Sequence, residues 1–232
     1  MNLTEAKTHF VNAWLPPNSG SGANDFVKRF CFDNPHLDVD QTAQLSAILA
    51  DRVETWLPQL FAAQVLMRTK IFDRSLMEPL LHAAIEIQDP SSNADFLWPC
   101  LTAFGAENVI DWLVDAFARA DQIHRIGISS LVYHLKSYPL DVLELINRKR
   151  SGLPWAEWVE SHDIDASKLR NTIAMAAQKT DNLIELYHYA QALDNTPEIF
   201  PNIPINAVEL SERIAGMPEY ETLLYDRLGW QR

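Results

Sequence analysis

The chain has 232 residues, 47% of them hydrophobic, and carries 31 acidic against 19 basic side chains, a formal net charge of −12. This length is enough for one domain with its own hydrophobic core. The negative charge argues against nucleic acids and anionic membranes as partners, because both require an electropositive protein surface. The sequence shows neither a secretory leader nor an apolar stretch long enough to cross a bilayer, so we expect a cytoplasmic protein that does not bind membranes.

Apolar residues recur at helical spacing along almost the whole chain, and strand-like alternation is nearly absent. This pattern predicts an all-α protein. The predicted helices, in chain order, lie at about residues 3–14, 24–32, 41–54, 56–69, 75–87, 94–104, 107–119, 122–137, 140–150, 154–161, 166–178, 181–193, 206–215 and 218–229. Two stretches rich in proline and polar residues, 16–22 and 195–204, are predicted to be connections.

Several helix ends carry recognisable signals. Ser75 and Glu78 have the spacing of a capping box, in which each side chain binds a backbone amide near the start of a helix. Asp95 and Asp165 are candidate N-terminal caps of the next helix and of the helix at 166–178. Gly105 is expected to take the left-handed conformation that ends many helices.

A short pattern, Pro-x-Leu-x-Ala, occurs three times, beginning at Pro58, Pro79 and Pro99. The copies are 21 and 20 residues apart, which leaves room for one helix and one turn per copy. A proline within the first turns gives up at most one backbone hydrogen bond and bends the helix, while the leucine and alanine suit a packed face. The pattern therefore predicts three consecutive bent helices.

Over about residues 55–139 this repeat resembles the HEAT and armadillo class of helical-hairpin repeats, in which a bent, proline-bearing helix packs against a second helix. The resemblance implies an irregular HEAT-like α-solenoid of about 12–14 helices in stacked antiparallel hairpins. We expect the whole chain, 1–232, to form one domain. The resemblance also implies a concave protein-binding surface and does not imply a reaction.

The C-terminal third, about residues 157–232, holds 13 acidic and 6 basic side chains, and a tryptophan pair stands at its start. Two tryptophans three residues apart share one helix face, and nearby carboxylates would make that face suited to a basic protein. The other reading of the pair is that both rings are buried in the core. The candidate partner-binding residues are Trp155, Trp158, Glu157, Glu160, Asp163 and Asp165.

Signals for catalysis, cofactors and metals are weak. None of the seven histidines has a second histidine three or four residues away, and the two cysteines, Cys31 and Cys100, lack the paired spacing of a zinc site. Both cysteines stand in apolar stretches, as expected of buried thiols in a reducing compartment. The acids near residue 38 lack the glycine and the terminal glutamate of a calcium loop. We therefore predict no catalytic residues, no cofactor and no metal.

These observations favour a non-enzymatic protein-binding protein: an acidic helical inhibitor or immunity-type protein that captures a basic partner such as a cationic toxin or nuclease. The small size and the acidic charge expected of this cytoplasmic protein are similar to those of bacterial toxin-immunity proteins. One alternative is a general HEAT-like adaptor or scaffold, whose acidity is incidental. The other is an all-helical enzyme with a histidine-carboxylate site at His162 or His188.

Overall fold

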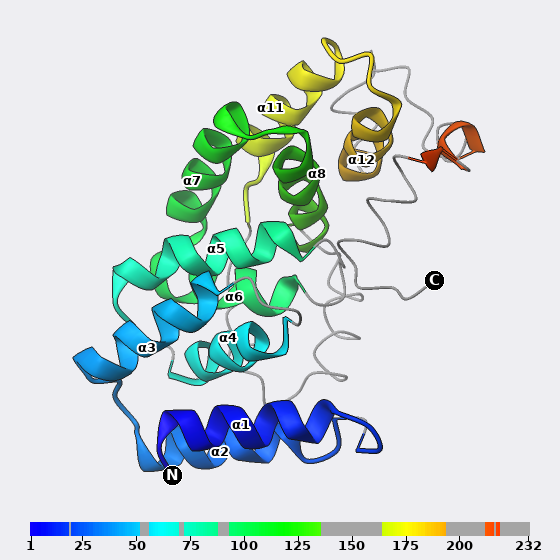
Figure 1. The fold of residues 1–232 in the computed structure, drawn as a ribbon. Helices are drawn as coiled ribbons and strands as arrows, with labels where there is room; N and C mark the ends of the chain where they lie inside the picture. Colours follow the sequence, from blue (N-terminus) through cyan, green and yellow to red (C-terminus); the bar gives the residue numbers. More distant parts are fainter. Residues whose placement is uncertain are drawn as a thin grey trace, which may run out of the picture. The chain divides into compact units, whose positions relative to one another are not determined.

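The computed structural model describes residues 1–18, 20–51, 56–69, 72–87, 93–135, 164–193, 212–215 and 217–218. In these ranges the chain is helical and contains no strand, which confirms the all-α prediction (Figure 1). The longer helices are α1 (Leu3–Trp14), α2 (Ala23–Asp33), α3 (Val39–Ala50), α4 (Leu57–Thr69), α5 (Met77–Glu86), α6 (Ala94–Phe104), α7 (Ala106–Arg119), α8 (Gln122–Leu131), α11 (Ser167–Ala177) and α12 (Leu183–Leu193).

Most of the predicted helices in the described ranges agree with these bounds to within two or three residues. The predicted helix 122–137 is shorter, because α8 ends at Leu131 and continues as the 3-10 turn η2 (Val132–Leu135). The predicted helices 140–150, 154–161 and 218–229 lie outside the described residues, and only the end of 206–215 falls inside them.

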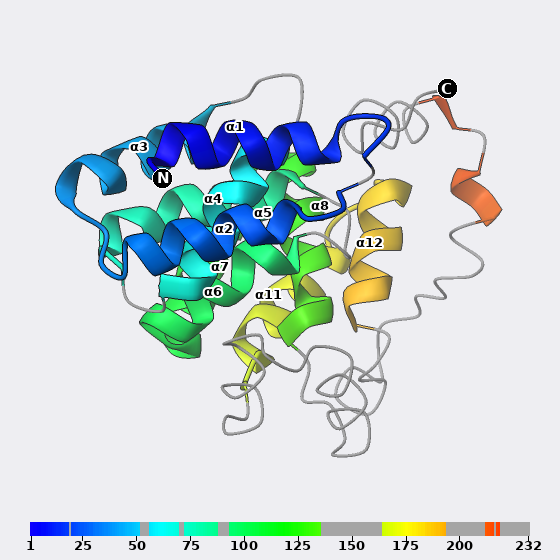
Figure 2. The ribbon, with the colours of Figure 1, turned by 90° about the horizontal axis from the view of Figure 1, so that it is seen from below.

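The contacts group the chain into two compact units. The first unit contains α1 to α4, the 3-10 turn η1 (Arg74–Leu76), α5 as far as Ala83, and α6 from Asp95. In this unit α1 and α2 run antiparallel side by side, and both contact α4 (Figure 2). Their apolar residues recur every three or four positions, so each helix turns one stripe toward α4.

Helix α4 is the centre of the first unit, since its buried residues surround the helix axis. Phe61 is fully buried, and its ring centroid lies 5.5 Å from that of Phe10 in α1 and 6.5 Å from that of Phe30 in α2. Gln59 is the buried polar exception. Its Nε2 atom donates to the carbonyl oxygens of Leu49 at 3.0 Å and Asp51 at 2.9 Å, so α4 satisfies the carbonyl groups that the end of α3 leaves unpaired.

The three Pro-x-Leu-x-Ala copies lie in three consecutive helices, as predicted. Pro58, Pro79 and Pro99 are the second residue of α4, the third of α5 and the sixth of α6. The three repeat leucines, and the alanines of the first two copies, are buried: Leu60, Leu81, Leu101, Ala62 and Ala83. The repeated residues are therefore part of the core of the first unit.

The predicted helix caps are confirmed only in part. Gly105 has a φ of 81° and ends α6, as expected. The capping box at Ser75 is wrong, because Asp73 accepts the amide of Ser75 at 2.8 Å and opens η1 before α5 begins. Asp95 lies inside the first turn of α6 and is not its cap.

The second unit contains α7, α8, η2, α11 and α12. Helix α12 packs against α8 and α11, and α7 packs against α8 and α11. Asn182 opens α12, because its Oδ1 atom accepts the amides of Ile184 at 3.0 Å and Glu185 at 3.1 Å. Two of the isoleucines at this packing, Ile126 and Ile184, form one apolar cluster with Ile214.

A glycine allows a close helix approach in this unit. A Cβ atom at Gly127 in α8 would lie 2.9 Å from the carbonyl carbon of Ile85 and would overlap its oxygen. Nearby, the Oδ1 atom of Asn93 lies 2.8 Å from Nε2 of His134, and the side-chain Nδ2 of Asn93 donates to Ser130 Oγ at 3.0 Å. This buried network satisfies polar groups beside the crossing.

Candidate functional site

Most of the partner-binding residues predicted from the sequence lie outside the described part of the chain: Trp155, Trp158, Glu157, Glu160 and Asp163. Asp165 is described and is exposed just before α11. Hydrogen bonding to the side chain of Ser167 and to its amide, which donates to Oδ1 at 2.9 Å, lowers the pKa of the carboxyl group. Asp165 therefore binds the amide of the first residue of α11, but the N-cap position itself is Ala166 and not Asp165 as predicted.

The described segment 164–193 of the C-terminal third is balanced in charge, with three acidic and three basic side chains. Lys168 in α11 forms an ion pair with Asp111 in α7. The acidic excess that the sequence shows in this third therefore does not come from α11 and α12.

Of the two histidines named for an enzymatic alternative, only His188 is among the described residues. His162 lies outside those residues. Burial lowers the pKa of His188 to about 4, and its buried Nε2 atom has no hydrogen-bond partner in the structure. Histidine-carboxylate contacts occur at His124, whose Nδ1 atom lies 2.6 Å from Oδ1 of Asp121, the cap of α8, and at His82, whose Nε2 atom lies 3.6 Å from Oε1 of Glu78.

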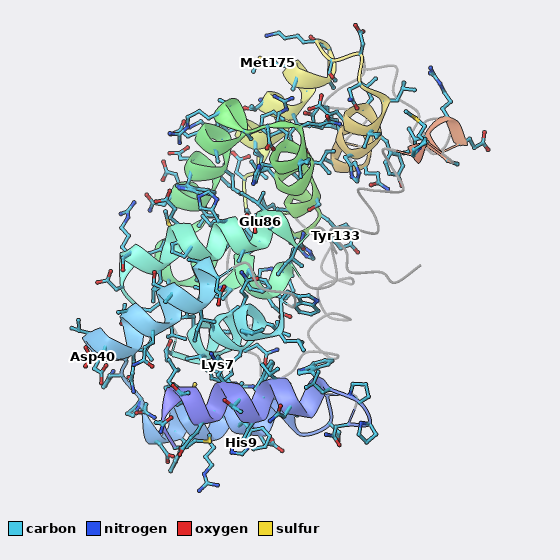
Figure 3. All side chains as sticks on the ribbon, viewed as in Figure 1. Lys7, His9, Asp40, Glu86, Tyr133 and Met175 are labelled. Carbon is cyan, nitrogen blue, oxygen red and sulfur yellow. The ribbon has the colours of Figure 1, made fainter. Side chains whose placement is uncertain are left out.

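Acidic side chains and exposed apolar side chains occur together where α2 ends and α3 begins. We call Phe32, Asp33, Asp38, Val39 and Asp40 the α2–α3 corner. Phe32 is 86% exposed and Val39 is 84% exposed, the largest values among the exposed large hydrophobic residues of the described chain. All three aspartates are exposed as well. Figure 3 labels Asp40 at the outer end of α3.

Local hydrogen bonds hold this corner in shape. The amide nitrogen of Asn34 and its side-chain Nδ2 both donate to the carbonyl oxygen of Phe30 at 2.9 Å, which ends α2. Asp38 and Gln41 form a capping box that starts α3. The Nε2 atom of Gln41 also donates to Oδ1 of Asn34 at 3.0 Å, so the end of one helix is tied to the start of the next.

Beside the corner lies an open groove of about 550 Å³, lined by the first residues of α1 and of α3. A second capping box, between Asn2 and Glu5, starts α1 at this groove. The groove wall includes Asp38 and Asp40 together with neutral amide and hydroxyl groups. The carboxylates of Asp38 and Asp40 can accept hydrogen bonds from a lysine or arginine side chain, while the amide and hydroxyl groups can donate or accept and the amino group of Met1 is positive.

The carboxylates of the corner keep most of their negative charge available. Asp33 is paired with the amino group of Met1 at 3.0 Å. Only Oδ1 of Asp38 accepts a hydrogen bond, from the amide of Gln41, and Asp40 has no ion pair or hydrogen bond with the described residues. Near the N-terminus of α3 both acids also interact favourably with the helix dipole.

Sequence reasoning considered these acids only as a failed calcium loop, and no group of metal-binding side chains is present in the described part of the chain. The usable signal was the alternation in Asp38-Val39-Asp40, where an apolar residue stands between two acids at a helix start. The exposure of Phe32 had no such signal, because it depends on where α2 ends relative to its neighbours.

None of the helices in the described ranges combines the length and apolarity needed to span a membrane. No protein-family model matches the chain, and searches of curated proteins and of solved structures found no similar protein. The function therefore has to be inferred from the residues of this chain.

Proposed function

We propose that the protein is a non-enzymatic binding protein that captures a basic protein partner, in the manner of an acidic inhibitor or immunity-type protein, and that the α2–α3 corner is a contact surface. The observation that carries the proposal is the pair of nearly fully exposed apolar side chains, Phe32 and Val39, set among three aspartates. The net charge of −12 supports the same class of partner.

The two kinds of side chain would contribute differently to binding. Covering an exposed aromatic ring removes apolar surface from water and is worth about 1.5–3 kcal/mol for a side chain the size of Phe32. Exposed carboxylates such as Asp40 contribute less affinity, about 0.2–1 kcal/mol for each ion pair, but they speed association with a basic protein. We therefore expect an apolar anchor within an acidic surface, and association that slows as salt is added.

The test is affinity capture from the native host with the full chain immobilised at about 50 mM salt, followed by titration of each captured protein against purified variants. The proposal requires a partner with a high isoelectric point. Phe32→Ala should weaken its binding at least about tenfold, the loss of about 1.4 kcal/mol. Asp40→Asn should mainly lower the association rate and its dependence on salt.

Two matched controls separate binding at this surface from the effect of net charge and from the effect of exposed apolar side chains elsewhere on the chain. Asp25→Asn removes an acid of α2 that is already paired with Lys28 at 3.2 Å. Met175→Ala removes another exposed apolar side chain, in the second unit. Both should bind as the wild type does. If every captured protein were acidic or neutral, or if Phe32→Ala bound as tightly as Met175→Ala, the proposal would be wrong.

The alternative is a general adaptor in which α4, α5 and α6 belong to HEAT-like stacked hairpins and a concave face holds a partner segment. It is supported by the repeat, whose leucines are buried in all three helices. Capture of several unrelated partners that Asp40→Asn and added salt leave unaffected would favour this adaptor over the inhibitor. The immunity-type reading would be favoured by a single partner whose toxic activity the chain suppresses.

A further inference from the structure

Phe32 and Val39 are exposed to a different degree from the other apolar side chains at the surface. Phe32 is 86% exposed and Val39 is 84% exposed, whereas no other large hydrophobic side chain in the described ranges exceeds 54%. A side chain near half exposure is covered on one side by its own chain, and a flat partner surface can cover the other side. A side chain as exposed as Phe32 is open to water on almost every side. Since the hydrophobic gain is proportional to the apolar area removed from water, only a concave site can realise most of it.

Hydrogen bonds tie together the two helix ends that carry these side chains. Asn34 ends α2, and its Oδ1 atom accepts a hydrogen bond from Nε2 of Gln41 in the first turn of α3 at 3.0 Å. The Oε1 atom of the same glutamine accepts the amide of Asp38 at 3.0 Å. Phe32 and Val39 therefore project from a connection that is ordered before binding, and less conformational entropy is lost when a partner covers them.

The acids of the corner gather beside one groove. Asp38 and Asp40 line this groove together with Met1, and the amino group of Met1 lies 3.0 Å from Oδ2 of Asp33. Three carboxylates against one amino group leave a net charge of −2 at this place. A partner that covers the corner must supply positive charge, because a carboxylate that loses water without gaining a cation or a donor is costly.

The charge also decides between possible occupants. A second copy of this chain would bring another acidic corner and another net charge of −12, so the two copies would repel each other. An apolar pocket with a neutral or acidic rim would leave the aspartates of the corner unpaired. An apolar pocket with a basic rim complements both the projecting ring and the carboxylates near it.

We propose that the α2–α3 corner is the inserted side of its interface: Phe32 enters a concave apolar pocket of the partner that is sized for a phenyl ring, and basic side chains at the rim of that pocket pair with the aspartates of the corner. This inference rests on the proposed function and adds the shape and the chemistry of the partner's surface. The protein would then fill a cavity of a basic partner, and would not cover a flat face of it.

The first test uses the full chain and three ring-shaped hosts with the same apolar cavity: amino-β-cyclodextrin, which has a rim of ammonium groups, neutral β-cyclodextrin, and carboxymethyl-β-cyclodextrin, which has a rim of carboxylates. Binding is followed by NMR through the backbone amide signals of the corner, at a pH where the amino groups are protonated. At about 20 mM salt the cationic host should bind at least about fivefold more tightly than the neutral host, and the anionic host more weakly than either. At about 0.5 M salt these differences should largely disappear.

Phe26→Ala is the matched control for Phe32→Ala. Phe26 belongs to the same helix, but its ring is stacked on that of His9 with centroids 5.1 Å apart, so a host cannot enclose it. Phe26→Ala should bind the cationic host at the corner as the wild type does, and Phe32→Ala should lose this binding. Equal affinity for the cationic and neutral hosts at low salt, or equal binding by the two variants, would overturn the inference.

The second test uses the basic partner obtained by affinity capture. In a pocket sized for a phenyl ring, Phe32→Trp should weaken binding about tenfold or more, because the larger ring overpacks the pocket. On a flat partner surface the same variant would bind as tightly as the wild type or more tightly, since tryptophan offers more apolar area. That result would overturn this inference and leave the proposed function standing. Capture of acidic or neutral proteins alone would instead refute the proposed function, whatever the hosts show.

Discussion

Replacing Gly127 with alanine tests the close approach of α8 to the backbone of Ile85. Helix propensity alone predicts that this change stabilises α8 by about 1 kcal/mol. The structure predicts the opposite, because the new Cβ atom would overlap the carbonyl oxygen of Ile85 and lie 2.9 Å from its carbonyl carbon. Real Cβ contacts essentially never fall below 3.0 Å, so one backbone has to move.

The expected loss of stability in Gly127→Ala follows from these two opposing effects, the gain in helix propensity and the cost of overpacking. Overpacking costs about 1–3 kcal/mol, and the upper part of that range applies where neither contact atom is the end of a flexible side chain. After subtracting the gain in propensity, we expect Gly127→Ala to lower the free energy of unfolding by about 1–2 kcal/mol. For a chain of this size that corresponds to a fall of about 3–6 °C in Tm.

The assay is urea unfolding followed by circular dichroism, with Gly105→Ala as the comparison. Gly105, unlike Gly127, has a positive φ, 81°, and a Cβ atom there meets nothing within 4 Å. That variant should show only the backbone cost of a left-handed alanine, about 1–2 kcal/mol, with no further loss when a larger side chain is introduced. Gly127→Val should lower the free energy of unfolding clearly more than Gly127→Ala does. A Gly127→Ala variant as stable as the wild type would refute the close approach of α8 to Ile85.

Two further predictions concern buried polar side chains. His188 has a pKa near 4 in the folded chain, below the usual value of 6.5, so the unfolded chain binds its proton first as the pH falls. Its contribution to stability should be complete above about pH 6.5 and should decline toward pH 4, by about 2 kcal/mol between pH 7.5 and pH 5. In unfolding measurements over that range, His188→Gln should show a pH dependence shallower by this amount, and identical profiles would contradict the burial of the ring. Gln59→Met should cost about 1–3 kcal/mol, because two carbonyl groups at the end of α3 lose their donor. Gln178→Met, at the exposed end of α11, is the control, and equal stability of the two variants would count against the role of Gln59 as a cap.

The helices could be predicted from the sequence because each apolar stripe reflects a local, periodic requirement. Phe10 with Ala6 and Ala13, for example, defines one face of α1 without any knowledge of α4. Helix starts were harder to predict, since several capping residues often stand close together. Asp73 takes the amide of Ser75, and the serine that looked like the cap becomes part of a 3-10 turn.

Contacts between residues far apart in the sequence could not be predicted in this way. Arg125 in α8 donates a hydrogen bond to Glu185 in α12, which is 60 positions away, and nothing local marks Glu185 as buried. The burial of the Tyr189 hydroxyl depends on the packing of α12 against α8 and α11. The sequence pointed to apolar side chains among acids only near Trp155, which lies outside the described residues, and did not point to the same combination at Val39.

Met175 in α11 lines an open cleft between α7, α8, α11 and α12 with a thioether that solvent reaches directly. Peroxide converts such a side chain to the sulfoxide, which is polar and forms hydrogen bonds with water. One added oxygen atom would change the wall from apolar to hydrated without altering the charge of the chain. The cleft is therefore sensitive to oxidants at its edge, while the buried thiol of Cys100, whose pKa is raised by burial, stays protonated and inert.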